Sequence, residues 1–178
     1  MKPTEQLKEE HKAIKLMLKV LEAMCRRLEN KENIPKEHFE KVLEFIKVFA
    51  DKCHHGKEED LLFPAMEKAG IPREGGPINV MLTEHNMGRD YVKGMSESVK
   101  GQDFDKFIEN ARGYIELLNQ HIEKEDNILY MMAEMHLQES EQEKLLRQFE
   151  KLERERIGPG KHEELHKLLH YLKEFYFV

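Results

Sequence analysis

Residues 54–63 read HHGKEEDLLF, and residues 121–130 read HIEKEDNILY. Both copies contain a histidine, a lysine three residues later, a glutamate four residues later, and then an apolar run that ends in an aromatic residue. A Glu-His pair precedes each copy, at residues 10–11 and at residues 84–85. The order of His followed by His-x-x-x-Glu therefore occurs twice, which predicts two related halves that meet around one centre.

The spacing of apolar residues is helical along the whole chain. From Thr4 to about Glu29, leucine, isoleucine and methionine recur every three, four or seven residues, which is the pattern of one buried helical face. The expected helices cover about residues 4–29, 36–68, 77–100, 104–130, 138–156 and 161–175. Pro64 is expected to break or kink the second of these helices. Because the connections are short, we predict an all-α, up-and-down four-helix bundle with additional C-terminal helices.

The length of 178 residues suits one domain. We therefore expect a single domain over residues 1–178. Within it, the metal-binding bundle is expected to cover about residues 5–135, and a C-terminal helical extension about residues 138–178.

Composition excludes several classes of partner. The formal net charge is −6 with both signs interspersed, so the chain lacks the basic stripe that nucleic acid requires. No apolar stretch approaches the roughly 20 residues of a membrane-spanning helix, and the first residues lack the apolar core of a signal peptide. Cys25 and Cys53 do not form a C-x-x-C motif, and free thiols suit a reducing compartment. We expect a cytoplasmic protein that binds neither nucleic acid nor membrane.

Helix geometry turns the repeated phrase into a ligand set. Side chains four residues apart lie on one helical face with Cβ atoms about 5–6 Å apart, so the histidine and the glutamate of each copy can point to the same place. Imidazoles together with carboxylates suit first-row transition metals, and a carboxylate can bridge two ions through its two oxygens. The predicted metal ligands are His11, His54, Glu58, His85, His121 and Glu125.

The same segments offer alternative residues as metal ligands. His55 and Glu59 also stand four residues apart, and Asp126 competes with Glu125 in the second copy. Aligning Lys57 with Lys124 places His54 over His121 and His55 over Ile122. This alignment favours His54 and Glu125 as ligands. We expect His55, Glu59 and Asp126 to be surface residues or outer partners of the ligands.

These motifs resemble the hemerythrin-like HHE cation-binding domain over about residues 5–135. The residues that carry the resemblance are Glu10-His11, His54-x-x-x-Glu58 with Leu62-Phe63-Pro64, Glu84-His85 and His121-x-x-x-Glu125. The resemblance implies a non-heme centre of two iron ions with an oxo or hydroxo bridge, in which the two glutamates bridge the irons and four histidines are terminal ligands. Zinc or manganese would accept the same residues.

One departure from the family bears on function. Oxygen-carrying hemerythrins have a fifth histidine one turn from the third-helix ligand, but Arg89 stands four residues after His85 and Met81 four before it. A centre with four imidazoles resembles the branch that includes iron-sulfur cluster repair and nitric-oxide-responsive proteins, although the cysteine-containing N-terminal extension of some repair proteins has no counterpart here. The resemblance implies a protein that binds or senses O2, NO or peroxide. The alternatives are reduction of peroxide or NO with a separate electron-donor protein, and donation of iron in cluster repair.

Histidines outside the repeat are expected to have other roles. His162, His166 and His170 recur every four residues on the last expected helix. A ferritin-type di-iron site needs the E-x-x-H spacing on two helices, and it occurs only once in this segment, so we expect a packing or solvated face. His38 and His136 have no partner at a useful spacing and are expected at the surface.

Overall fold

The computed structural model describes residues 1–177, and every regular element within them is helical. Segments labelled η are π-helical, with hydrogen bonds that span five residues instead of four. The elements in chain order are α1 (Pro3–Glu29), α2 (Lys36–Glu44), η1 (Phe45–His55), η2 (Glu58–Leu62), α3 (Phe63–Lys68), α4 (Pro77–Lys100), α5 (Phe104–Lys124), η3 (Glu125–Leu129), α6 (Tyr130–His136), α7 (Glu139–Leu152), η4 (Glu153–Ile157) and α8 (Lys161–Tyr176). The prediction of an all-α fold is confirmed.

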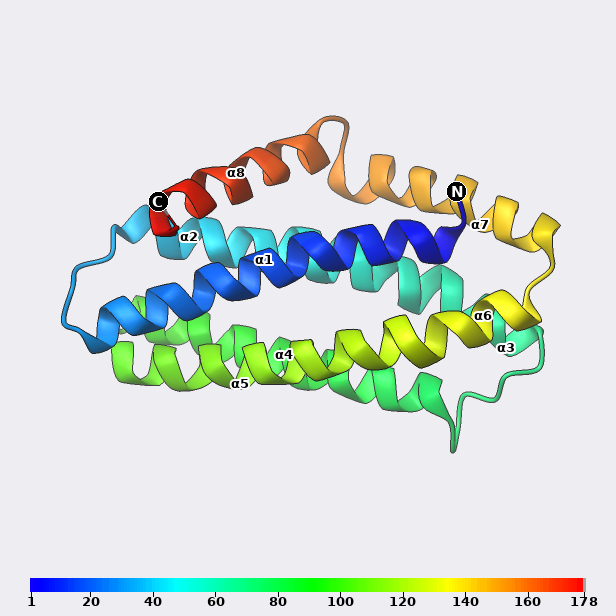
Figure 1. Cartoon of the computed structure of the whole chain (residues 1–178), viewed down its shortest axis with the longest axis horizontal. Coiled ribbons are helices and arrows are strands. Elements are labelled where there is room, and N and C mark those ends of the chain that lie inside the picture. Colours follow the sequence, from blue (N-terminus) through cyan, green and yellow to red (C-terminus); the bar gives the residue numbers. More distant parts are fainter. Residues whose placement is uncertain (178) are drawn as a thin grey trace.

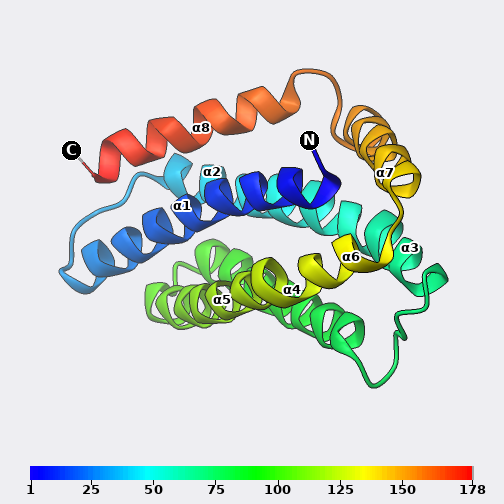
Figure 2. The ribbon, with the colours of Figure 1, turned by 45° about the vertical axis from the view of Figure 1, so that its right-hand side comes forward.

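Four rods form the bundle, as Figure 1 shows. The rods are α1, the run from α2 to α3, α4, and the run from α5 to α6. The additional helices α7 and α8 lie across the outer side of α1 and of the second rod (Figure 2). This is the bundle of hemerythrin type with C-terminal helices that the sequence predicts.

Local sequence signals explain where the helices begin. Proline occupies the first turn of α1 and of α4, where a missing N–H removes no helical hydrogen bond. Asp103 caps α5 because its Oδ1 accepts a hydrogen bond from the backbone N–H of Lys106 at 3.1 Å. Pro64 does not end the second rod. It lies in the first turn of α3, directly after η2, and the helix continues to Lys68.

Each copy of the repeated phrase contains a π-helical turn. The turn η2 begins at Glu58 and η3 begins at Glu125, which is the same position in both copies. Insertions of this kind are rare in helices and are frequent at functional sites. The repeat therefore extends to the backbone of the two segments.

A layer of buried polar side chains divides the hydrophobic core into two clusters. Along α1, Leu7 belongs to one cluster and Ile14 to the other, and His11 lies between them. Along the second rod, Phe49 and Leu62 belong to different clusters in the same way. Helix α8 packs on the larger cluster, and α7 on the smaller one. The polar layer therefore crosses the bundle between two apolar regions.

None of the helices in residues 1–177 combines the length and the apolar character that crossing a lipid bilayer requires.

Candidate metal centre

The polar layer contains all six residues that the sequence predicts as ligands, and each is at most 2% exposed. These residues are His11, His54, Glu58, His85, His121 and Glu125. Together with His55, these residues form two groups of candidate ligands, and the ligand atoms of each group lie within 4.8 Å of one another. One group is His11, His54, Glu58 and Glu125, and the other is His55, Glu58, His85 and His121. The two groups share Glu58.

Each glutamate lies between imidazoles of both groups. Glu58 Oε1 is 3.6 Å from His54 Nε2 and 3.4 Å from His85 Nε2. Glu125 Oε1 is 3.3 Å from His11 Nε2 and 2.9 Å from the Nε2 of His121. Carboxylates in these positions can each contact two cations, one in either group.

Within each half of the bundle, a Glu-His pair orients the histidine of the repeated phrase. Glu10 Oε1 lies 2.9 Å from His54 Nδ1, and Glu84 Oε1 lies 2.9 Å from His121 Nδ1. A hydrogen bond from Nδ1–H to a carboxylate fixes the tautomer in which Nε2 is unprotonated and can coordinate a metal ion. Glu10 therefore orients His54, and Glu84 orients His121, so that Nε2 of each points toward the centre.

Between the halves, the residue that follows Glu58 or Glu125 orients the remaining histidine. Asp126 Oδ1 lies 2.7 Å from His11 Nδ1, and Glu59 Oε2 lies 2.7 Å from His85 Nδ1. Asp126 and Glu59 are thus outer partners of the predicted ligands, which is one of the two roles expected for them.

His55 lies beside the predicted ligands. It is 4% exposed, its ring stacks on His85 at a centroid distance of 3.8 Å, and its Nδ1 lies 3.2 Å from Asp51 Oδ1. This geometry leaves Nε2 of His55 among the candidate ligand atoms of the second group. The predicted surface position of His55 is wrong, whereas its other predicted role, as an outer partner of the ligands, stays a prediction. Five imidazoles converge at the centre, and the fifth comes from the second rod, on η1.

The lysines of the repeated phrase form ion pairs with Glu10 and Glu84. Lys57 Nζ is 2.6 Å from Glu10 Oε2, and Lys124 Nζ is 2.7 Å from Glu84 Oε2. The sequence comparison used these lysines only to align the two copies. Their position explains why the copies share them, because each lysine neutralises the carboxylate that orients a histidine of its own half.

The charges at the centre are balanced by protons when no cation is bound. Burial disfavours charge on the imidazoles, but hydrogen bonds to neighbouring carboxylates raise the pKa of His11 and of His85 to about 9. Burial also opposes charge on His121, yet Coulomb attraction to Glu125 and hydrogen bonds raise its pKa to about 10. Burial would raise the pKa of Glu125, but its attraction to His121 holds that pKa well below the usual range.

Several ligand atoms lack a well-aligned partner. Glu58 Oε1, both carboxylate oxygens of Glu125 and His54 Nε2 are buried without a hydrogen bond. Buried carboxylate oxygens are costly unless a donor or a cation satisfies them. The donor set therefore fits cations bound between the two groups.

Tyr130 is a residue of the centre that the sequence reasoning missed. It is fully buried, and its hydroxyl donates a hydrogen bond to Glu58 Oε2 at 2.7 Å. The hydroxyl oxygen of Tyr130 also lies 3.3 Å from His11 Nε2. The corresponding residue of the first copy is Phe63, which has no hydroxyl. This difference between two otherwise matched positions was the signal available in the sequence.

The family model of the hemerythrin HHE cation binding domain matches residues 2–133. The chain belongs to this family. The uncharacterized proteins Mb2018 of Mycobacterium bovis and Rv1995 of Mycobacterium tuberculosis are each 26% identical to it over 132 residues, which is 71% of this chain and 51% of each relative. The chain thus spans about half the length of these relatives. No solved structure matches it.

The match to the hemerythrin HHE domain ends within α6, so α7, η4 and α8 lie beyond it. A third group of possible ligand atoms, Glu10, Glu153 and His162, joins this extension to the bundle. Lys57 Nζ already lies 2.6 Å from Glu10 and 3.2 Å from Glu153, so an ammonium group occupies the place of a cation.

The histidines outside the hemerythrin HHE match have packing roles or face solvent. The rings of His162 and His166 lie 5.0 Å and 5.3 Å from that of Phe49, in agreement with the predicted packing face, and His170 is exposed.

Of the two isolated histidines, His136 is exposed as predicted. His38, by contrast, is completely buried, and its Nδ1 lies 2.8 Å from the hydroxyl of Tyr176, so its predicted surface position is wrong. Helix α8, which brings Tyr176, covers the side of α2 that carries His38.

Proposed function

We propose that the hemerythrin HHE bundle of this chain holds two iron ions and uses them to bind or sense a small ligand such as O2, NO or peroxide. The observation that carries the proposal is the pair of ligand groups that share Glu58. Zinc and manganese accept the same donor types, and iron is preferred because the resemblance to hemerythrin-like centres implies it. The two free, buried cysteines suit work in the reducing cytoplasm.

The two groups offer different numbers of protein ligands. The group that contains His55 supplies three imidazoles, whereas the group that contains His11 supplies two, and the glutamates stand between them. The group with fewer imidazoles has more room for an exogenous ligand. Tyr130 lies beside this group, where its hydroxyl can donate a hydrogen bond to such a ligand.

The chain's own residues would control the chemistry of the centre. Two bound iron ions would supply electrons to the small ligand and accept them again. Glu58 and Glu125 would hold the pair together, and the outer carboxylates would keep each imidazole neutral at Nε2 and correctly oriented. The apolar clusters on both sides of the polar layer would limit the entry of water.

The proposal is tested by loading the metal-free protein with Fe(II) under anaerobic conditions. We expect two ions per chain, and a stable optical adduct after separate additions of O2, NO and hydrogen peroxide to the reduced protein. Reversal of the O2 or NO spectrum on removal of the gas supports binding or sensing. Sustained consumption of the ligand in the presence of an electron donor would establish a reductase with a separate donor protein instead. Loss of iron to an acceptor protein would support iron donation, and failure to take up metal would overturn the proposal.

Removal of Glu58 should affect both ions, because both groups include this residue. We expect Glu58→Ala to lose most of the bound metal and His55→Ala to lose less, since His55 belongs to one group only. Metal analysis of the purified variants measures the difference. Glu123→Ala is the control, because Glu123 is exposed two residues from Glu125. Equal metal content in the Glu58 and Glu123 variants would contradict the assignment.

Removal of the Tyr130 hydroxyl should change reactivity more than metal content. Tyr130→Phe keeps the ring and deletes the hydrogen bond to Glu58, at a cost of about 1 kcal/mol in the free energy of unfolding. We expect two bound ions per chain and an altered spectrum or lifetime of the ligand adduct. The measurements are metal analysis and stopped-flow spectroscopy. An unchanged adduct in this variant would show that the hydroxyl does not reach the ligand.

A further inference from the structure

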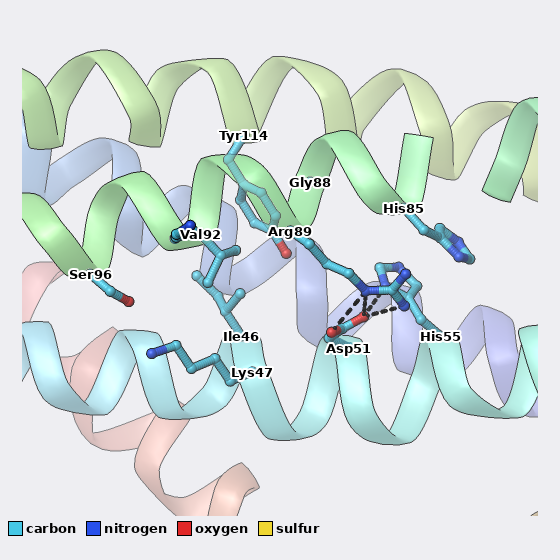
Figure 3. A pocket seen from close by; sticks show the side chains of 11 residues that line it. Ile46, Lys47, Asp51, His55, His85, Gly88, Arg89, Val92, Ser96 and Tyr114 are labelled. Atoms are coloured by element: carbon cyan, nitrogen blue, oxygen red, sulfur yellow. Dashed lines mark hydrogen bonds and ion pairs between the residues drawn. The ribbon is translucent and has the colours of Figure 1, made fainter. Parts of the chain in front are cut away.

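A cavity of about 290 Å³ opens between η1 and α4 and reaches the edge of the candidate metal centre. Figure 3 shows its lining, with His55 and His85 at one end and Ser96 at the other. Tyr114 of α5 extends into the space between them. Ile46 and Val92 provide apolar walls.

The size of this cavity exceeds the needs of a diatomic ligand. One water molecule takes up about 30 Å³ in the liquid, so the cavity has roughly the volume of ten waters. Pockets for small organic molecules begin at about 300 Å³. The volume therefore suits a compact organic molecule.

The ionic side chains in the lining are mostly positive. Lys47, Arg89 and Lys93 face Asp51 as the single carboxylate. Lys47 and Lys93 are exposed and form no ion pair within residues 1–177. Arg89 is held in place by Asp51 at 2.8 Å and by Glu59 at 2.6 Å, and 37% of its side chain remains accessible. An anion entering the cavity would thus meet an excess of positive charge.

Hydroxyl groups add hydrogen-bond donors to this charge. Ser96 Oγ is buried and has no hydrogen-bond partner. The hydroxyl of Tyr114 stays protonated, because burial and the nearby Asp51 both raise its pKa. Two hydroxyl donors and two lysines without an ion pair, beside an apolar wall, form a lining that complements a negatively charged head group with an apolar body.

We propose that this cavity binds a small organic carboxylate, with its apolar body against Ile46 and Val92 and its carboxylate held by Lys47, Lys93 and the hydroxyl of Ser96. Arg89 already donates hydrogen bonds to Asp51, Glu59 and Asn86, so the two lysines and the unpartnered Ser96 hydroxyl are the groups left to hold the carboxylate. The site is built from protein atoms alone and needs no bound metal. Asp51, His55 and His85 line the cavity, and Asp51 Oδ1 lies 3.2 Å from His55 Nδ1, so an occupant would contact residues at the edge of the metal centre.

Benzoate is the probe that tests the proposal, and benzamide is its neutral counterpart of nearly the same shape. Each is titrated into metal-free and into metal-loaded protein at constant ionic strength, with calorimetry and ¹⁵N NMR as readouts. We expect benzoate to bind at least about tenfold more tightly than benzamide, with the largest NMR shifts along η1 and the facing part of α4. Inorganic phosphate serves as a third probe and should bind more weakly than benzoate, because it has no apolar body.

Two variants locate the binding site. Val92→Phe fills the apolar end and should abolish benzoate binding, and Lys93→Gln should weaken it without filling the space. Lys19→Gln is the matched control, because Lys19 is an exposed lysine on α1, outside the cavity lining. Circular dichroism checks that each variant is folded. If Val92→Phe does not fold, Lys93→Gln alone decides whether binding depends on the cavity.

The outcomes separate this site from the metal function. Equal binding of benzoate and benzamide, or equal binding of benzoate and phosphate, would overturn the proposal, as would the absence of benzoate binding. An effect of Lys19→Gln equal to that of Lys93→Gln would also overturn it, because it would reveal a non-specific charge effect. Benzoate binding by a protein that takes up no metal would leave this proposal standing while the proposed function fails. Metal uptake without benzoate binding would do the reverse.

Discussion

Lys57 and Lys124 occupy the same position in the two copies of the repeated phrase but differ in exposure. The Lys57 side chain is 1% exposed, and that of Lys124 is 43% exposed. The difference comes from Glu153 on η4, which lies 3.2 Å from Lys57 and covers one half of the centre. The outer carboxylates Glu10 and Glu84 therefore experience different dielectric surroundings although their sequence contexts match.

This difference predicts unequal effects of removing the two charges. Lys57→Met leaves Glu10 and Glu153 without their shared cation in a buried place, which should cost about 3–5 kcal/mol in the free energy of unfolding. Lys124→Met removes a partly exposed ion pair and should cost at most about 1 kcal/mol. Urea unfolding of the metal-free variants measures both values. Similar costs for the two variants would contradict the role of η4 as a cover.

At the same scale, the sequence predicted six of the residues that meet in the polar layer and missed His55 and Tyr130. His55 was not chosen as a ligand because aligning Lys57 with Lys124 places it over Ile122, and because His54 lies nearer the apolar stripe on a regular helical wheel. The segment Phe45–His55 is π-helical, and its wider turn changes the direction of each side chain, so both histidines reach the centre. Residue periodicity carries no signal for this change. Tyr130 was missed because an aromatic residue at the end of an apolar run is usually a core residue.

The helices α7 and α8 are structural parts of the core as well as a cover. Phe149 of α7 belongs to the smaller cluster, and Leu165 and Leu169 of α8 belong to the larger one. The end of α8 is fixed by the hydrogen bond between Tyr176 and the buried His38. Burial lowers the pKa of His38, so a neutral imidazole is favoured at this contact.

Loss of the Tyr176 hydroxyl should loosen α8. Tyr176→Phe leaves Nδ1 of His38 buried without a partner, and we expect a cost of about 1–3 kcal/mol in the free energy of unfolding. Tyr91→Phe is the control, since Tyr91 lies on α4 and its hydroxyl forms no hydrogen bond within residues 1–177. The control should change stability by less than about 0.5 kcal/mol. Thermal and urea unfolding test the comparison, and equal effects would show that the buried contact does not anchor the helix.

Apolar spacing, prolines and the Asp103 cap were sufficient to predict the helices and their approximate ends. The same signals could not predict the covering of α2 by α8. Two amphipathic helices beyond the bundle can pack on several of its faces, and the choice depends on tertiary contacts such as the one between His38 and Tyr176. The π-helical turns were also beyond reach, because each needs only one extra residue per turn within an unbroken apolar pattern.

For the molecule as a whole, the polar layer must remain nearly neutral in every state. Without metal, the raised pKa values of His11, His85 and His121 keep these imidazoles protonated at pH 7, opposite Glu58 and Glu125. Protonated imidazoles stabilise the metal-free fold most fully below their unfolded pKa of about 6.5. This stabilisation is lost as the pH rises through about 9 to about 10.

Metal uptake should therefore release protons. Each ligating imidazole must be neutral at Nε2, so binding at pH 7 displaces protons from the three histidines whose pKa lies above 7. The apparent affinity for metal should consequently rise with pH between about pH 6 and about pH 8. Calorimetry in buffers of different ionisation enthalpy counts the released protons. Uptake without proton release at pH 7 would contradict this charge balance.

The outer hydrogen bonds divide into two kinds, with consequences for assembly. Those from Glu10 and Glu84 connect segments of the same helical hairpin, whereas those from Asp126 and Glu59 connect opposite hairpins. The first hairpin alone can orient His54 and His55, and the second alone can orient only His121, so neither hairpin completes the ligand set. Binding of two metal ions thus requires both hairpins to pack against each other. The optical absorption of the metal-loaded centre would therefore report whether the native tertiary structure is present.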